Sequence, residues 1–211
     1  MYFLKYILFF DQHTFLYLIG YFFIGEQKQK GIVLQDIRSS RAIQEYLNKY
    51  KAEVETWRVG RAYAALKLRE LDGCYGGELA GHYYFRVFYY SDSALLAASI
   101  VLRLLAERKK EGKTLSQIID EISPYSNSGE INFKIERKQE AMDAVKGHFT
   151  QIEKPERFLD FDGYRLDYSD WWLNIRPSNT EPYLRFLCEA KSEAKLHEII
   201  TTVKEIVEKW S

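Results

Sequence analysis

The stretch that decides the fold reads Trp171-Trp172-Leu173-Asn174-Ile175-Arg176-Pro177-Ser178-Asn179-Thr180-Glu181-Pro182-Tyr183-Leu184-Arg185-Phe186-Leu187-Cys188. Its two ends are rich in aromatic and aliphatic residues, which is typical of strands, while its middle is polar and contains two prolines. The pattern predicts strands over 171–175 and 183–190 and a short loop over 176–182. We expect this loop to be held at both ends by a sheet.

The loop between these strands has the composition of a phosphate-binding site. The guanidinium of Arg176 offers a planar fork of donors that matches two phosphate oxygens. Ser178, Asn179, Thr180 and the backbone N–H groups of the loop supply further donors. The alternative is an ordinary polar loop between two strands, and the loop residues alone leave both interpretations open.

Outward from this loop, the chain is expected to form two domains. Residues 123–129 are dense in turn formers and mark a boundary. Beyond them, strand patterns predominate, followed by a helix with one apolar face near the C-terminus, which indicates an α+β domain with an antiparallel sheet. Before them, strand and helix patterns alternate, which indicates an α/β domain. We therefore expect domains at 1–123 and 124–211, the second smaller than the first.

Composition excludes several classes of protein. The 30 Lys and Arg residues balance the 30 Asp and Glu residues, so no basic field favours nucleic acid. Cys74 and Cys188 are far apart, which predicts a cytoplasmic protein without a disulfide framework. The four histidines are scattered, so we expect no metal cluster.

The N-terminal 24 residues are rich in aromatic and aliphatic side chains and are similar to a membrane anchor in composition. Charged residues interrupt the run at Lys5 and Asp11, and the uncharged stretch 15–24 is too short to span a bilayer. We expect a strand over 6–10 and a buried helix near 15–25 instead.

A second stretch with candidate binding residues is Gly76-Gly77-Glu78-Leu79-Ala80-Gly81-His82. Glycine allows a backbone to approach a ligand closely. The carboxylate of Glu78 can accept hydrogen bonds from adjacent hydroxyls of a sugar ring, and the imidazole of His82 can donate or accept. The alternative is a glycine-rich hairpin in which both side chains are structural.

Together and in this order, the two loops resemble those of the α-D-phosphohexomutase superfamily, specifically phosphomannomutase/phosphoglucomutase. Residues 176–182 resemble the phosphate-binding loop of that family's fourth domain, and residues 76–82 resemble the sugar-recognition loop of its third domain, usually GEMSGH. Supporting matches are Leu34-Gln35-Asp36-Ile37-Arg38-Ser39-Ser40, Trp57-Arg58-Val59-Gly60 and His82-Tyr83-Tyr84-Phe85-Arg86. The resemblance runs from about Tyr6 to the C-terminus.

The resemblance implies a three-layer α/β/α domain with a mixed sheet, followed by a smaller antiparallel-sheet domain with helices on one face. It implies hexose phosphates of mannose or glucose as ligands. Glu78, His82 and Arg61 would contact the substrate. The phosphate ligands would be Arg176, Ser178, Asn179 and Thr180.

The sequence departs from the family pattern at the groups that perform the chemistry. The family's phosphoserine lies in a TASHNP-like motif and its Mg²⁺ is bound by a DGDxDR loop, and neither string occurs in these 211 residues. Arg61 replaces a usual His, Ala80 a usual Ser or Thr, and Val87 a usual Asp. We therefore expect no catalytic residue and no cofactor in this chain, and no mutase activity from it alone.

Three hypotheses follow. The first is the C-terminal portion of a phosphohexomutase whose catalytic half is missing or lies on a separate chain. The second is a sugar-phosphate binding protein without catalysis. The third is a membrane-tethered interaction module that uses the aromatic N-terminus.

Overall fold

The computed structural model describes residues 12–114, 117, 124–178 and 181–210. The chain divides between Pro124 and Tyr125 into two compact units, here called the first and the second unit. The strand expected over 6–10 lies outside the described residues.

The described elements of the first unit are α2 (Gln12–Gly20), the π-helix η1 (Tyr21–Glu26), β1 (Ile32–Asp36), α3 (Arg41–Asn48), β2 (Glu53–Trp57), α4 (Arg61–Glu70), β3 (Tyr75–Gly77), β4 (Tyr83–Phe85), the 3₁₀-helix η2 (Arg86–Phe88), β5 (Ser91–Asp92) and α5 (Ala94–Lys110). Those of the second unit are β6 (Ser126–Asn127), β7 (Ile131–Lys134), α7 (Lys138–Ile152), β8 (Arg157–Leu159), β9 (Tyr164–Asp167), β10 (Trp171–Pro177), β11 (Tyr183–Ala190) and α8 (Glu193–Glu208).

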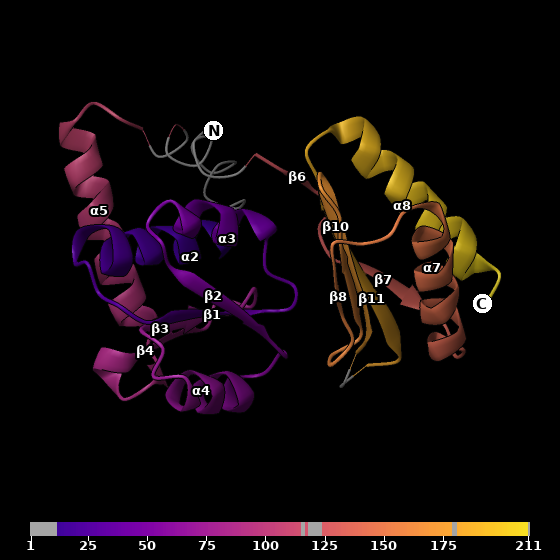
Figure 1. Cartoon of the computed structure of the whole chain (residues 1–211), viewed down its shortest axis with the longest axis horizontal. Helices are drawn as coiled ribbons and strands as arrows, with labels where there is room; N and C mark the ends of the chain where they lie inside the picture. Colours follow the sequence, from indigo (N-terminus) through magenta and orange to yellow (C-terminus); the bar gives the residue numbers. More distant parts are fainter. Residues whose placement is uncertain (1–11, 115–116, 118–123, 179–180, 211) are drawn as a thin grey trace, which may run out of the picture. The chain divides into compact units, whose positions relative to one another are not determined.

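The first unit contains a mixed sheet with the strand order β2-β1-β3-β4-β5. β1 runs parallel to β2 and β3, whereas β3, β4 and β5 pair antiparallel. Figure 1 shows α2 and α3 on one face of this sheet and α4 on the other. Val33 and Leu34 are consecutive on β1 and both are buried, as expected for a strand covered on both faces. The predicted three-layer α/β/α architecture is confirmed.

The second unit contains an antiparallel sheet with the order β6-β11-β10-β9-β8, and β7 also pairs with β11. α7 and α8 lie on one face of it (Figure 1). Side chains alternate along β10 because successive residues of a strand point to opposite faces. Trp171, Leu173 and Ile175 belong to the core that includes residues of both helices. The predicted α+β unit with helices on one face is confirmed.

The opposite face of this sheet is polar although it is buried. Trp172 is fully buried, and its indole Nε1 donates to Oε2 of Glu189 at 2.8 Å. The guanidinium of Arg165 lies 4.0 Å from the centre of the Trp172 ring and donates to Asp167 at 2.9 Å. Asn127 of β6 donates to the other Glu189 oxygen at 2.9 Å. The even-numbered positions of β10 therefore lie on a face of hydrogen bonds and ion pairs.

Two short strands differ from the sequence expectation. β6 lies inside 123–129, which was expected to be only a boundary turn, and it pairs with the end of β11. The sequence shows no strand pattern for β5, and Asp92 before the apolar stretch 93–110 favours the start of a helix. Ser93 is the N-cap of α5 instead, its Oγ accepting from the backbone N–H of Leu96 at 3.2 Å. Strands of two residues are too short to show a period-2 pattern.

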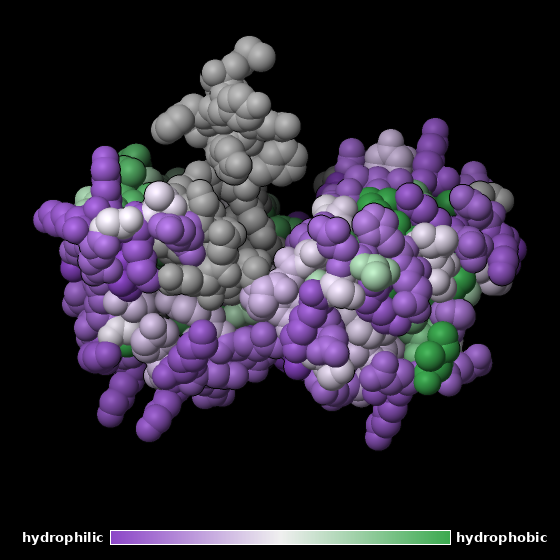
Figure 2. Space-filling view, turned by 90° about the horizontal axis from the view of Figure 1, so that it is seen from above, coloured by the Kyte–Doolittle hydropathy of each residue, from purple (hydrophilic) through white to green (hydrophobic). Residues whose placement is uncertain are grey.

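The described surface is mostly polar, and Figure 2 shows hydrophilic groups over most of the visible face of each unit. Among the described residues, none of the helices combines the length and the hydropathy needed to cross a membrane. Cys74 and Cys188 are both free and buried, and burial raises the pKa of each thiol to about 12. Both cysteines therefore have the environment of structural core residues.

Candidate functional site

The first candidate site is the tight turn that joins β3 to β4. The carbonyl of Glu78 accepts from the N–H of Gly81 at 2.9 Å, and the N–H of Glu78 donates to the carbonyl of His82 at 2.9 Å. Gly81 has a φ of 85°, a left-handed conformation that favours glycine. Gly76 and Gly77 belong to β3 rather than to the predicted loop, because they pair with β1. The turn thus brings Glu78 and His82 to its two ends.

Asp36 attaches this turn to the central strand. It is the last residue of β1 and is 2 % exposed. Its Oδ2 accepts from the backbone N–H of Leu79 at 2.8 Å and from the guanidinium of Arg38 at 2.6 Å. Its Oδ1 accepts from the backbone N–H of Arg38 at 2.7 Å. The Asp36 carboxylate therefore fixes the backbone of this turn at the edge of the sheet where the parallel strands end.

Glu78 itself is 3 % exposed. The hydroxyl of Tyr84 donates to its Oε1 at 2.9 Å, and its Oε2 receives no hydrogen bond from the described part of the chain. Burial raises the pKa of the Glu78 carboxyl, and the negative charge of Asp36 raises it further. The hydrogen bond from Tyr84 and the charges of Arg38 and His82 lower this pKa, but burial has the largest effect. Glu78 is therefore a buried acceptor with one oxygen available.

His82 is partly exposed and is paired with a second acid. Its Nδ1 lies 2.6 Å from Oδ2 of Asp92, with 43 % of its own side chain exposed. Arg61 is the exposed first residue of α4. Burial and the Glu78 charge raise the pKa of the Tyr84 hydroxyl, and the Arg61 guanidinium acts in the opposite direction. Arg61 therefore lies within electrostatic reach of Tyr84, the residue that holds Glu78.

Three residues of this site were not predicted as site residues: Asp36, Tyr84 and Asp92. A carboxylate at the end of a buried parallel strand is a usable signal, because ligands of α/β sheets bind at the carboxyl ends of the strands. Asp36 meets that description. Tyr84 and Asp92 carry no comparable signal, since they reach the site through antiparallel pairing of β4 with β5.

The second candidate site is the hairpin between β10 and β11. The N–H of Ser178 donates to the carbonyl of Tyr183 at 2.9 Å, which closes the hairpin. The hydroxyl oxygen of Ser178 accepts from the N–H of Glu181 at 3.2 Å, so this side chain also stabilises the turn. Asn179 and Thr180, the other predicted phosphate ligands of the loop, lie outside the described residues.

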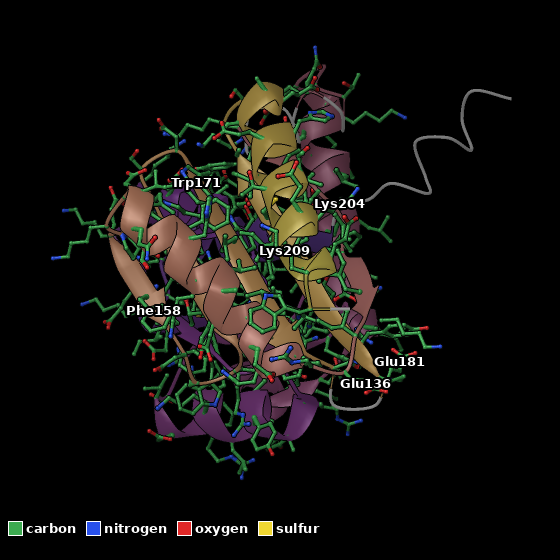
Figure 3. All side chains as sticks on the ribbon, turned by 90° about the vertical axis from the view of Figure 1, so that its right-hand side faces the viewer. Glu136, Phe158, Trp171, Glu181, Lys204 and Lys209 are labelled. Atoms are coloured by element: carbon green, nitrogen blue, oxygen red, sulfur yellow. The ribbon has the colours of Figure 1, made fainter. Side chains whose placement is uncertain are left out.

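Arg176 lies on the polar face of the sheet and is 5 % exposed. Its direct cross-strand partner in the β10–β11 register is a second arginine, Arg185. Arg185 forms ion pairs with Glu130 at 2.9 Å and with Glu181 of the loop. Figure 3 shows Glu181 at the end of the sheet away from Trp171, where the hairpin turns. The charge of Arg185 is thus balanced by two carboxylates, and Arg176 is the buried arginine directly opposite it.

Gly163, just before β9, makes room for Arg176. Its φ is 73°, and a Cβ built on it would lie 2.3 Å from Cβ of Arg176 and 2.5 Å from the carbonyl oxygen of Ile175. Both are parts of the β10 backbone or next to it, so they cannot move aside independently of the strand. The position of Arg176 therefore depends on a glycine at 163.

We expect Gly163→Ala to lower the free energy of unfolding by about 1–3 kcal/mol, because it adds backbone strain and a clash. The matched control is Gly147→Ala in α7, where a Cβ would meet nothing within 4 Å. That change is expected to raise stability by about 0.5–1 kcal/mol. Urea unfolding followed by circular dichroism measures both. Equal effects of the two substitutions would contradict the close approach.

Comparison with known proteins identifies the family of this chain. The sequence model described as "Phosphoglucomutase/phosphomannomutase, alpha/beta/alpha domain III" matches residues 11–125. The model described as "Phosphoglucomutase/phosphomannomutase, C-terminal domain" matches residues 130–206. The chain belongs to the phosphoglucomutase/phosphomannomutase family.

Curated relatives of this family agree with that assignment. A phosphomannomutase of Methanocaldococcus jannaschii is 34 % identical over 186 residues, which is 88 % of this chain and 40 % of the relative. A phosphomannomutase of Escherichia coli is 30 % identical over 210 residues, 93 % of this chain and 44 % of the relative. The chain thus spans less than half the length of these two phosphomannomutases.

Solved structures show the same fold. A phosphoglucomutase/phosphomannomutase family protein from Burkholderia thailandensis superposes with a TM-score of 0.77 at 20 % identity, covering 93 % of this chain and 41 % of that one. A phosphoglucomutase (parafusin) from Paramecium superposes with a TM-score of 0.73 at 12 % identity, covering 94 % and 42 %.

The Mg²⁺ that the family resemblance implies finds no fitting set of ligands in the described part of the chain. Among the described residues, no group of three or more His, Cys, Asp or Glu side chains is arranged to hold a metal ion. The carboxylates that do lie together, Asp36 and Glu78, are occupied by Arg38, by a backbone N–H and by Tyr84. No step involving a metal is therefore assigned to these residues.

Proposed function

We propose that this chain is the substrate-holding, C-terminal portion of a phosphohexomutase and that it binds mannose or glucose 1- or 6-phosphate. The observation that carries the proposal is the opposite hydrogen-bonding character of the two sites. The turn 78–82 offers acceptors, and the hairpin 176–182 offers donors. A hexose phosphate has hydroxyl donors at its ring and acceptor oxygens at its phosphate.

The acceptors of the first unit suit sugar hydroxyls. Oε2 of Glu78 is the available oxygen of a carboxylate whose other oxygen is held by Tyr84. Because the carboxylate is also fixed through the backbone turn, it is oriented before a ligand arrives, which lowers the entropic cost of binding. We propose that Glu78 and His82 contact ring hydroxyls and that Arg61 approaches the same ligand from the start of α4.

The donors of the second unit suit a phosphate. Arg176 is a buried arginine directly opposite Arg185 in the β10–β11 register, and its planar fork can bind two phosphate oxygens. Ser178, Asn179 and Thr180 are the proposed remaining ligands. These groups position the phosphate and neutralise its charge, which is a large part of catalysis in phosphoryl transfer.

The 211 residues contain neither a TASHNP-like serine motif nor a DGDxDR loop. We propose that these residues alone do not interconvert hexose phosphates. The phosphoserine and Mg²⁺ would come from the family's N-terminal domains, on the same polypeptide or on a separate chain. The cysteine usage supports a cytoplasmic location for this function.

Isothermal titration with mannose 6-phosphate, mannose and inorganic phosphate tests the binding function. We expect both mannose 6-phosphate and inorganic phosphate to bind, since each carries the phosphate that the donors of the second unit suit. Absence of binding by all three compounds would overturn the proposal.

A coupled assay with glucose 1-phosphate, glucose 1,6-bisphosphate and Mg²⁺ tests the catalytic half of the proposal. We expect no turnover from the 211 residues. Turnover would show that they carry their own phosphoryl-transfer group. If the chain binds the sugar phosphate, adding the N-terminal domains of a relative distinguishes a portion of a mutase from a binding protein without catalysis. Turnover in the mixture supports the portion of a mutase, and no turnover favours the binding protein.

A further inference from the structure

The carboxylate of Asp92 lies at the edge of the first site and contacts the backbone of Tyr83 and the ring of His82. Its Oδ1 accepts from the backbone N–H of Tyr83 at 3.1 Å, and its Oδ2 lies 2.6 Å from Nδ1 of His82. Backbone pairing holds it in place, because Asp92 is opposite Tyr84 in the β4–β5 register and the N–H of Ser93 donates to the carbonyl of Tyr83 at 2.9 Å. Both oxygens therefore have fixed partners.

An ionised carboxylate only accepts hydrogen bonds, so the short contact requires a proton on Nδ1 of His82. In neutral imidazole one nitrogen carries the proton and the other accepts. We infer that Asp92 is a positioning residue that fixes the proton of neutral His82 on Nδ1 and presents Nε2 as an acceptor. No described residue donates to Nε2, and the imidazole is partly exposed.

The consequence for recognition rests on the proposed function. Nε2 of His82 and Oε2 of Glu78 would form a pair of acceptors at the two ends of one turn. Two neighbouring sugar hydroxyls can each donate to one member of this pair. A fully ionised phosphate group has no donor hydrogen, so the same pair disfavours a phosphate at this turn. Asp92 would thereby contribute to the choice of hydroxyls over phosphate without touching the ligand.

The Asp92→Asn variant tests this inference directly, because it is expected to change the tautomer of His82. The amide oxygen would accept from the N–H of Tyr83, as Oδ1 does now, which turns the NH₂ group toward Nδ1 of His82. Nδ1 must then accept, and the proton moves to Nε2. The substitution is nearly isosteric, so it reverses the polarity of Nε2 while it preserves the shape of the site.

The test is ¹⁵N NMR of the histidine side chains in the ligand-free protein at about pH 8.5, where an ordinary imidazole is neutral. His197 is an internal reference, because its Nδ1 lies 2.7 Å from the carbonyl oxygen of Glu193 and must donate to it. We expect His82 to show the same Nδ1–H tautomer as His197 in the wild type and the Nε2–H tautomer in Asp92→Asn. A wild-type His82 with its proton on Nε2 would overturn the inference, whether or not the variant folds.

Titration with mannose 6-phosphate then measures the effect on binding. We expect Asp92→Asn to weaken binding by about two- to tenfold, the range for one hydrogen bond. The matched control is Asp72→Asn, an acid of the same unit that bonds Tyr90 and Arg86 instead, and its affinity and His82 tautomer should equal those of the wild type. An unchanged affinity in Asp92→Asn despite a reversed tautomer would overturn the recognition role. Wild-type protein with the expected tautomer but no affinity for the sugar phosphate would contradict the proposed function and leave the positioning role of Asp92 supported.

Discussion

Arg176→Ala is expected to weaken binding of mannose 6-phosphate and of inorganic phosphate by at least about 100-fold. Hydrogen bonds to a charged group contribute about 1.5–3 kcal/mol each, and a bidentate guanidinium forms two of them. Loss of about 3 kcal/mol corresponds to about 100-fold in the dissociation constant. Isothermal titration with both ligands measures the change. Because inorganic phosphate lacks a sugar, its loss of affinity isolates the second unit.

Two variants control this experiment. Arg176→Lys keeps the charge but loses the planar fork, so an intermediate loss of about tenfold is expected. Arg137→Ala removes an arginine of the same unit that is paired with Glu140 and packed on Trp210, and it should leave affinity unchanged. Thermal unfolding of each variant checks that the fold persists. If Arg176→Ala binds phosphate within about twofold of the wild type, Arg176 is not a phosphate ligand.

Trp172→Ala is expected to lower the free energy of unfolding of the second unit by about 3–5 kcal/mol. The side chain is fully buried, so its removal leaves a cavity. It also removes the donor that bonds Glu189 and the ring that faces the Arg165 guanidinium. Urea unfolding, followed by circular dichroism, measures the loss. For a unit of this size the change is a large fraction of the whole stability.

Two tryptophan variants separate packing from hydrogen bonding. Trp172→Phe retains a ring but removes the N–H, and we expect a loss of about 1–3 kcal/mol from the buried Glu189 oxygen that it leaves without this donor. Trp210→Ala, at a partly buried tryptophan beside the core on the other face of the sheet, should cost clearly less than Trp172→Ala. A cost below about 1 kcal/mol for Trp172→Ala would contradict the buried network, because cavity formation alone exceeds that value.

Much of the fold was predictable because its main elements have strong periodicity. Residues 53–57 alternate between polar and apolar, which favours a strand, and β2 has those bounds; the apolar stretch 93–110 favours a helix, and α5 starts one residue later. The α/β class of the first unit and the α+β class of the second unit both follow from such elements. The two-residue strands β5 and β6 were not predictable, because pairing with a neighbouring strand creates them and their own sequences show no pattern.

The candidate sites were predictable where a local motif carries them. Glu78, His82 and Arg176 stand in short stretches whose composition indicates binding. Asp92 was interpreted as a helix-start residue, since Asp is a common helix cap, but tertiary pairing directs its carboxylate to His82. Asp36 and Tyr84 likewise act through contacts that are distant in sequence or lie across a turn.

The strict alternation along β10 has a practical consequence for protein engineering. Odd positions 171–175 face the core with α7 and α8, and the even positions, Arg176 among them, lie on the polar face of the sheet. A library varied only at Leu173 and Ile175 is expected to change thermal stability, whereas one varied at Arg176 would test the proposed phosphate ligand. Inserting one residue at the middle of the strand would exchange the two sets and lose both properties at once. The core-facing positions and the proposed phosphate ligand can therefore be varied separately on this strand, provided that its length is kept.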